Sequence, residues 1–264
     1  MKKVLLRTLP AALLLPVLVM AQSAFVGTWK ADLSNNVEMP KQPFRYLLIH
    51  DVYRCEICAP PYSVKADGQD HEVAGHPYFD TVRIKIINDS SIEETDKKGG
   101  KTVTVTTTQV AKDGMTELVT SSDSSNSNGA PVDSKIELTR VAKGTAGSHA
   151  ISGSWRMTKF ESVSDNGELV TYALSGSTLR MTAPTGQSFA APVDGTDSPF
   201  SGDPGQTSVS IKRIDDRTVD EIDRRNGKVI STEHMTVSVD GKTMTVAWKD
   251  MLHGTSGSFT NVKQ

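Results

Sequence analysis

The sequence predicts an all-β protein built from two tandem antiparallel meander β-barrels. The main reason is an internal duplication: residues 67–119 align without a gap on residues 194–246, with 19 of 53 positions identical. Most of the matched residues form turns or strands, so the duplication conserves a scaffold and no obvious chemistry. A second reason is that no apolar 3.6-residue period persists for three turns, as an amphipathic helix would require.

Turn signals divide the duplicated stretch into short hairpin-linked strands. Val82, Ile84 and Ile86 alternate with basic residues, as expected of a half-buried strand. Reversals are predicted where residues that favour positive φ occur together, and they recur in both halves: Gly99-Gly100 and Asp113-Gly114, then Asn226-Gly227 and Asp240-Gly241. Such a meander hides its edges most directly by closing into a barrel.

Each half opens with the same short motif, an apolar residue followed by Gly-x-Trp and a basic residue. The motif contains Gly27 and Trp29 in the first half and Gly153 and Trp155 in the second. Glycine permits a close backbone approach, and the large aromatic ring can fill one end of a barrel.

The N-terminus has the three parts of an export signal. Lys2 and Lys3 precede an apolar run that is interrupted by Pro10 and Pro16, and the run is too short to span a bilayer comfortably. We therefore predict a cleaved signal peptide at residues 1–21, no later membrane-spanning segment, and a periplasmic or extracellular location.

The rest of the chain is divided by its repeat. We predict one barrel over residues 22–141, a linker over 142–150 and a second barrel over 151–264. Loss of the signal would leave 26 basic against 31 acidic side chains, a net charge of −5. That balance gives no electrostatic reason to expect nucleic acid as a partner.

The Gly27-Thr28-Trp29 opening, the antiparallel meander and a basic residue on the closing strand, Arg140, together resemble the lipocalin and calycin superfamily. The resemblance implies that Arg140 packs across the tryptophan of its own half and closes the barrel. It also implies a small, largely apolar ligand in the barrel cavity. At an offset of 121 the second half has Asn261 in place of Arg140, which leaves Lys263 as the only nearby basic residue.

Cys55 and Cys58 allow three interpretations. A disulfide is the default in an exported chain, and a redox role is the sharper alternative because the ring is small. A metal site is the third, since Cys55, Cys58, His71 and His76 have zinc-finger spacing. The second half lacks all four ligands and has Thr182, Thr185, Ser198 and Asp203 at the matching positions. The finger fold is therefore not expected, and the sequence implies no cofactor.

Adjacent carboxylates such as Glu93-Glu94 and Asp220-Glu221 lie near Lys97-Lys98 and Arg224-Arg225. Consecutive strand residues face opposite sides, so one carboxylate of each pair is expected to face cross-strand basic residues on the solvent side, in a solvated charge ladder.

We expect a non-enzymatic exported protein that binds a small apolar or amphipathic molecule. One alternative is a structural or interaction module of the cell envelope, whose protein partner the sequence does not indicate. Another is a redox or metal centre. Because the cysteines and both histidines belong to the first half, any further chemistry is expected there.

Overall fold

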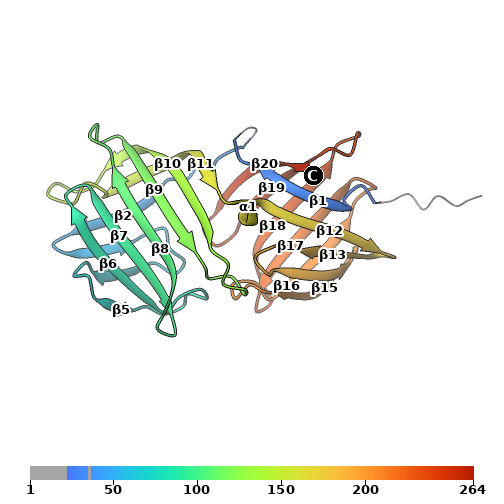
Figure 1. Cartoon of the computed structure of the whole chain (residues 1–264), viewed down its shortest axis with the longest axis horizontal. Coiled ribbons are helices and arrows are strands. Elements are labelled where there is room, and N and C mark those ends of the chain that lie inside the picture. Colours follow the sequence, from blue (N-terminus) through green and yellow to red (C-terminus); the bar gives the residue numbers. More distant parts are fainter. Residues whose placement is uncertain (1–22, 35–36) are drawn as a thin grey trace, which may run out of the picture.

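The chain forms two antiparallel ten-stranded sheets that lie side by side, which confirms the predicted all-β fold (Figure 1). This computed structural model describes residues 23–34 and 37–264, so the predicted signal peptide at residues 1–21 lies outside the described residues. A four-residue helix, α1 (Asp165–Glu168), joins the two sheets along the chain. Within the described ranges, no helix is long and apolar enough to cross a membrane.

The first sheet has the strand order β4-β3-β2-β11-β10-β9-β8-β7-β6-β5. Its strands, in chain order, are β2 (Phe44–Ile49), β3 (Val52–Cys55), β4 (Tyr62–Lys65), β5 (Asp70–Glu72), β6 (Thr81–Asn88), β7 (Ser91–Lys98), β8 (Lys101–Val110), β9 (Thr116–Asp123), β10 (Val132–Lys143) and β11 (Gly153–Val163). It is strongly curled around its own apolar core, which includes Leu48, Ile84 and Trp155.

The second sheet closes completely, and we call it the closed barrel. Its strands are β1 (Gly27–Asp32), β12 (Leu169–Ser175), β13 (Thr178–Thr182), β14 (Ser188–Pro192), β15 (Asp194–Ser201), β16 (Ser208–Arg213), β17 (Thr218–Arg225), β18 (Lys228–Val237), β19 (Thr243–Asp250) and β20 (Thr255–Lys263). It is a consecutive meander from β12 to β20, and β1 closes it.

The two Gly-x-Trp strands do not join the sheets of their own halves. β1 pairs with β12 and β20, so the start and the end of the described chain meet in the closed barrel. β11 pairs with β10 and β2 in the first sheet. The predicted linker at residues 142–150 does not separate the two sheets. It runs from the end of β10 into the hairpin that leads to β11, and both strands belong to the first sheet. The first sheet is thus contiguous over residues 44–163.

Both tryptophans nevertheless occupy equivalent places. Trp29 and Trp155 are fully buried, and each donates its indole N–H to a backbone carbonyl four residues earlier, Phe25 and Ile151, at 2.7 Å. The glycine of the motif is needed at Gly153, where φ is +133° and an added Cβ would lie 2.3 Å from the Ala142 carbonyl oxygen. The predicted role of the motif at a barrel end is consistent with these contacts.

A basic side chain covers each tryptophan, and it comes from the other half of the chain. Arg140 lies over Trp155, with its Cζ 3.9 Å from the ring centroid, and Lys263 Nζ lies 5.0 Å from the ring of Trp29. The expected contact of Arg140 with Trp29 is therefore wrong, because the tryptophan strands join the other sheets.

Lys263, and not Asn261, is the structural counterpart of Arg140. Arg140 pairs with Trp155 in the same way that Lys263 pairs with Trp29. The sequence offset of 121 is therefore two residues out of register. Asn261 instead corresponds to Leu138 and faces the interior.

Replacing Arg140 with lysine is expected to destabilise the protein by about 3 kcal/mol in urea unfolding. The guanidinium donates hydrogen bonds to the carbonyls of Gly114, Ala150 and Ser152 at 2.6–2.7 Å, and an ammonium has no planar fork to reach all three. Lys263→Arg is the matched control, with an expected change below about 1 kcal/mol. Equal effects of the two substitutions would contradict this account.

Candidate functional site

Carboxylates point into both sheets at duplicated positions. Glu94 and Asp96 on β7 recur as Glu221 and Asp223 on β17. The side chains of Glu221 and Asp223 are only 7% and 5% exposed. The charge-ladder prediction places one carboxylate of each adjacent pair on the solvent side, and Asp220 lies there with its side chain 43% exposed. Its neighbour Glu221 faces the interior.

In the first sheet, tyrosines bind the interior carboxylates. Tyr62 donates a hydrogen bond to Glu94, and Tyr46 donates one to Glu117, which is fully buried. Burial raises the pKa of Glu117 to about 8, against the opposing effects of Tyr46 and Arg140. Burial also raises the pKa of Asp96 to about 8, and the charge of Glu94 adds to this shift. The tyrosine rings occupy the interior, so these groups form a polar core.

The closed barrel contains a cavity of about 290 Å³. Four carboxylates line it: Glu168, which pairs with Lys30, and Glu221, Asp223 and Glu233. Asp223 accepts hydrogen bonds from Gln206 Nε2 at 2.5 Å and from Ser231 Oγ at 2.6 Å. The remaining wall is largely apolar and includes Tyr172, Met181, Phe200, Met235, Val246 and Phe259. The cavity thus combines an acidic side with an apolar side.

Glu221 and Glu233 lie directly opposite each other on β17 and β18. Like charges at such a cross-strand pair are destabilising, so the pair favours a proton or a bound cation. Burial raises the pKa of Glu221, and the charges of Glu233 and Asp223 raise it further. Burial, with the charge of Asp223, raises the pKa of Glu233 to about 7.

A comparison of equivalent positions explains why the closed barrel has this cavity. Tyr53 and Tyr62 of the first sheet correspond to Leu179 and Phe189, which have no hydroxyl group to donate a hydrogen bond to a carboxylate. Glu233 has no acidic counterpart, because Thr106 stands at the matching position. The glutamate of the duplicated pair is therefore bound by tyrosines in the first sheet, as Glu94, and faces a cavity in the closed barrel, as Glu221.

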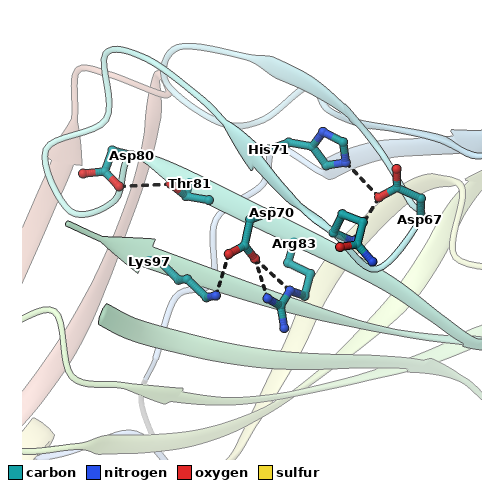
Figure 2. Close-up of polar contacts among 8 residues, drawn as sticks. Asp67, Asp70, His71, Asp80, Thr81, Arg83 and Lys97 are labelled. Carbon is teal, nitrogen blue, oxygen red and sulfur yellow. Dashed lines mark hydrogen bonds and ion pairs between the residues drawn. The ribbon is translucent and has the colours of Figure 1, made fainter. Parts of the chain in front are cut away.

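The two cysteines form a disulfide with a Cα–Cα distance of 5.5 Å, so their sulfurs are not free to bind a metal. His76 is buried, stacks on Phe79 with ring centroids 4.5 Å apart, and has a pKa lowered by burial. His71 instead bonds Asp67 at 2.8 Å on the outer surface (Figure 2). Among residues 23–34 and 37–264, no group of three or more His, Cys, Asp or Glu side chains is arranged to hold a metal ion.

A surface ion-pair cluster lies beside His71. Figure 2 shows Asp70 of β5 between Arg83 and Lys97, with contacts of 2.7 Å and 2.6 Å. The closed barrel repeats one of these pairs, since Arg224 contacts Asp197 at 2.7 Å. These pairs join neighbouring strands on the outer face, as a charge ladder should.

The disulfide lies at a groove of about 720 Å³ between the first sheet and the closed barrel. Cys58 and Arg45 line it from one side, and Arg225 and Lys228 line it from the other. The sheets also touch directly, because Tyr78 donates a 2.9 Å hydrogen bond to Asp203. The disulfide thus belongs to a segment packed near the other sheet.

Sequence reasoning missed the cavity residues Glu221, Asp223, Glu233 and Asn261. One signal was available: the Glu-x-Asp pattern is identical in both halves, whereas the residues between and before the two acids differ. Identity at alternate strand positions indicates a shared inner face. The sequence led us to expect any further chemistry in the first half. The cavity lies instead in the closed barrel, which consists of β1 and strands β12 to β20 of the second half.

No known protein-family model matches the chain, and no curated protein is similar to it at a significant level.

Proposed function

We propose that the protein is a non-enzymatic binding protein for a small amphipathic molecule, which occupies the cavity of the closed barrel. The cavity is the single observation that carries this proposal. Its volume of about 290 Å³ lies near the lower end of the range for small-molecule pockets. An apolar wall with a few convergent polar groups is the usual composition of such sites.

The resemblance to lipocalins and calycins supports the same conclusion, since barrels of that superfamily enclose small ligands. Each sheet has ten strands here, whereas lipocalin barrels have eight. The chain is therefore proposed as a lipocalin-like protein on the basis of its meander and its Gly-x-Trp strands. We further propose that it is exported, from the pattern of residues 1–21 and the disulfide.

The first sheet fits the alternative role of a structural or interaction module. Its interior is occupied by Tyr46, Tyr53 and Tyr62, whose hydroxyls bond Glu94 and Glu117. An interior filled by these side chains leaves no space for a small ligand. We therefore propose that ligand binding belongs to the closed barrel, and that the first sheet supports it.

Filling the cavity is expected to abolish binding. Wild-type protein should increase the fluorescence of the neutral apolar probe N-phenyl-1-naphthylamine, and Val246→Trp should weaken its binding by about tenfold or more, or ~1.4 kcal/mol. Val246 is 2% exposed and lines the cavity. Val119→Trp, at the equivalent position of the first sheet, is the matched control and should bind the probe normally.

Circular dichroism and thermal melting verify that both variants fold, and Met181→Trp fills the same cavity from another strand. The proposal fails if the wild type gives no fluorescence increase. It also fails if the folded cavity variants bind the probe as tightly as the wild type does.

A further inference from the structure

We propose that the ligand of the closed barrel is a small organic cation: an ammonium group between Glu221, Glu233 and Asn261, attached to an apolar body. This inference rests on the proposed function, because it identifies the class of molecule that the cavity takes. It is independent of the resemblance, which implies only a largely apolar ligand.

The first supporting observation is the side chain of Asn261. It is 4% exposed and lines the cavity from β20. Among the described residues no hydrogen-bond partner is found for its amide, whose polar atoms are not fully enclosed by protein and so face the cavity. An ammonium N–H can donate to Asn261 Oδ1, so a ligand of this class supplies a partner that the surrounding side chains do not.

The second observation is the opposed pair of Glu221 and Glu233. A monovalent cation between them replaces carboxylate repulsion by two attractions, and in a low-dielectric cavity both are stronger than in water. The hydroxyl of Tyr172 lines the same cavity, and its recorded hydrogen bond is a weak one, to Met235 Sδ at 3.7 Å. A donor or acceptor on the ligand can use this hydroxyl as well.

The surrounding charges leave this end of the cavity acidic. Asp223 lies on the same strand as Glu221, and Glu168 lines the cavity from α1. No lysine or arginine side chain lines the cavity among the described residues, and Lys30, which pairs with Glu168, also contacts Asp165. A negatively charged head group would therefore meet carboxylates without a cation to offset them.

The apolar wall determines the remainder of the ligand. Phe200, Phe259 and Val246 form part of the apolar wall of the cavity. A bare metal ion would leave this surface in contact with water, whereas an aryl or alkyl body buries it, at about 25 cal/mol per Å². The cavity as a whole therefore suits an arylalkylamine or an alkylamine.

Two probes of matched shape test the inference. 2-Phenylethylamine is protonated at pH 7, and 2-phenylethanol is neutral. Isothermal titration calorimetry should show the amine binding the full-length protein at least about tenfold more tightly than the alcohol, or ~1.4 kcal/mol. Glu233→Gln and Asn261→Leu should reduce this preference several-fold, because they weaken the binding of the amine more than the binding of the alcohol. Asp220→Asn is the matched control, because it removes a carboxylate from the outer face of β17, next to the cavity residue Glu221.

Proton release provides a second readout. Binding of a cation stabilises the carboxylates, so the amine should displace protons from the Glu221 and Glu233 pair. Titrations in two buffers of different ionisation enthalpy would reveal the release, and the alcohol should give none. If both probes bind equally, the inference fails while the proposed function stands. If neither probe nor the apolar fluorophore binds, both fail.

Discussion

Deleting residues 23–34 is expected to unfold the closed barrel while the first sheet stays folded. The deletion removes β1, which pairs with both β12 and β20, so two sheet edges become exposed at once. It also removes Trp29 and Phe25, which are 0% and 2% exposed in the apolar core of the barrel. Loss of a buried tryptophan side chain alone costs about 3–5 kcal/mol. That is a large part of the total stability of a domain, about 5–15 kcal/mol.

The measurement is backbone amide hydrogen exchange on the deletion variant. Protection should disappear from β12 to β20 and remain in β6 to β10. Adding a synthetic peptide of residues 23–34 should restore protection, because the barrel then regains its missing strand. The same peptide with Trp29→Ala is the matched control and should restore little. Persistent protection of β12 and β20 without any peptide would contradict the topology.

Fragments offer a complementary comparison. A fragment of residues 44–163 contains all ten strands of the first sheet, whereas a fragment of residues 22–141 lacks β11 and carries the unpaired β1. The boundaries predicted from the repeat imply that the fragment of residues 22–141 folds on its own. The pairing of β11 with β2 and β10 implies that the fragment of residues 44–163 does so.

The sequence predicts the meander well because its signals are local. Glycines and Asn226 adopt positive φ at the hairpins that Gly100, Gly114, Gly227 and Gly241 mark. Nearby residues do not determine which sheet each of the two Gly-x-Trp strands joins. Trp29 and Trp155 carry the same motif and make the same carbonyl bond, so either strand is compatible with either sheet. What differs is the hairpin after β10, which returns the chain to the first sheet.

The site was harder to predict for two separate reasons. Acidic residues in strands are normally solvated, so residue type alone predicts that Glu221 and Glu233 are exposed, and only the duplicated Glu-x-Asp pattern indicates that Glu221 faces the interior. Asn261 was misaligned with Arg140 because the short match of Thr139 with Thr260 outweighed the strand register. Cross-strand pairing shows that Asn261 lies opposite Met244, as Leu138 lies opposite Glu117. Polar and apolar residues have therefore exchanged places inside the two sheets.

The stability of the protein is expected to decrease as the pH rises from about 5 to about 8. Asp96, Glu117 and Glu233 have folded-state pKa values of about 8, about 8 and about 7, well above their values in an unfolded chain. The folded state therefore holds more protons than the unfolded state throughout this window. Each such group lowers the free energy of unfolding by up to about 1.4 kcal/mol per pH unit between its two pKa values.

The carboxylates on the outer surface affect the stability of the protein in a lower pH range. Hydrogen bonds lower the pKa of groups such as Asp67, Asp70 and Asp113, so their contribution is lost only as the pH falls below about 4. Stability should accordingly be greatest near pH 5. Urea unfolding at pH 5, 6, 7 and 8 measures the slope directly.

Glu117→Gln isolates one of the three buried carboxyls. The amide still accepts the hydrogen bond of Tyr46 and cannot ionise, so the slope between pH 5 and pH 8 should become shallower by up to about 1.4 kcal/mol per pH unit. Glu137→Gln changes a half-buried residue of β10, leaves the interior carboxyls in place and should keep the wild-type slope. Stability that rises from pH 5 to pH 8, or an unchanged slope in Glu117→Gln, would show that these carboxyls ionise freely within the fold. The raised pKa values of Glu117 and Asp96 follow from burial and, for Asp96, from neighbouring acids, so a flat profile would mean that water reaches the interior of the first sheet.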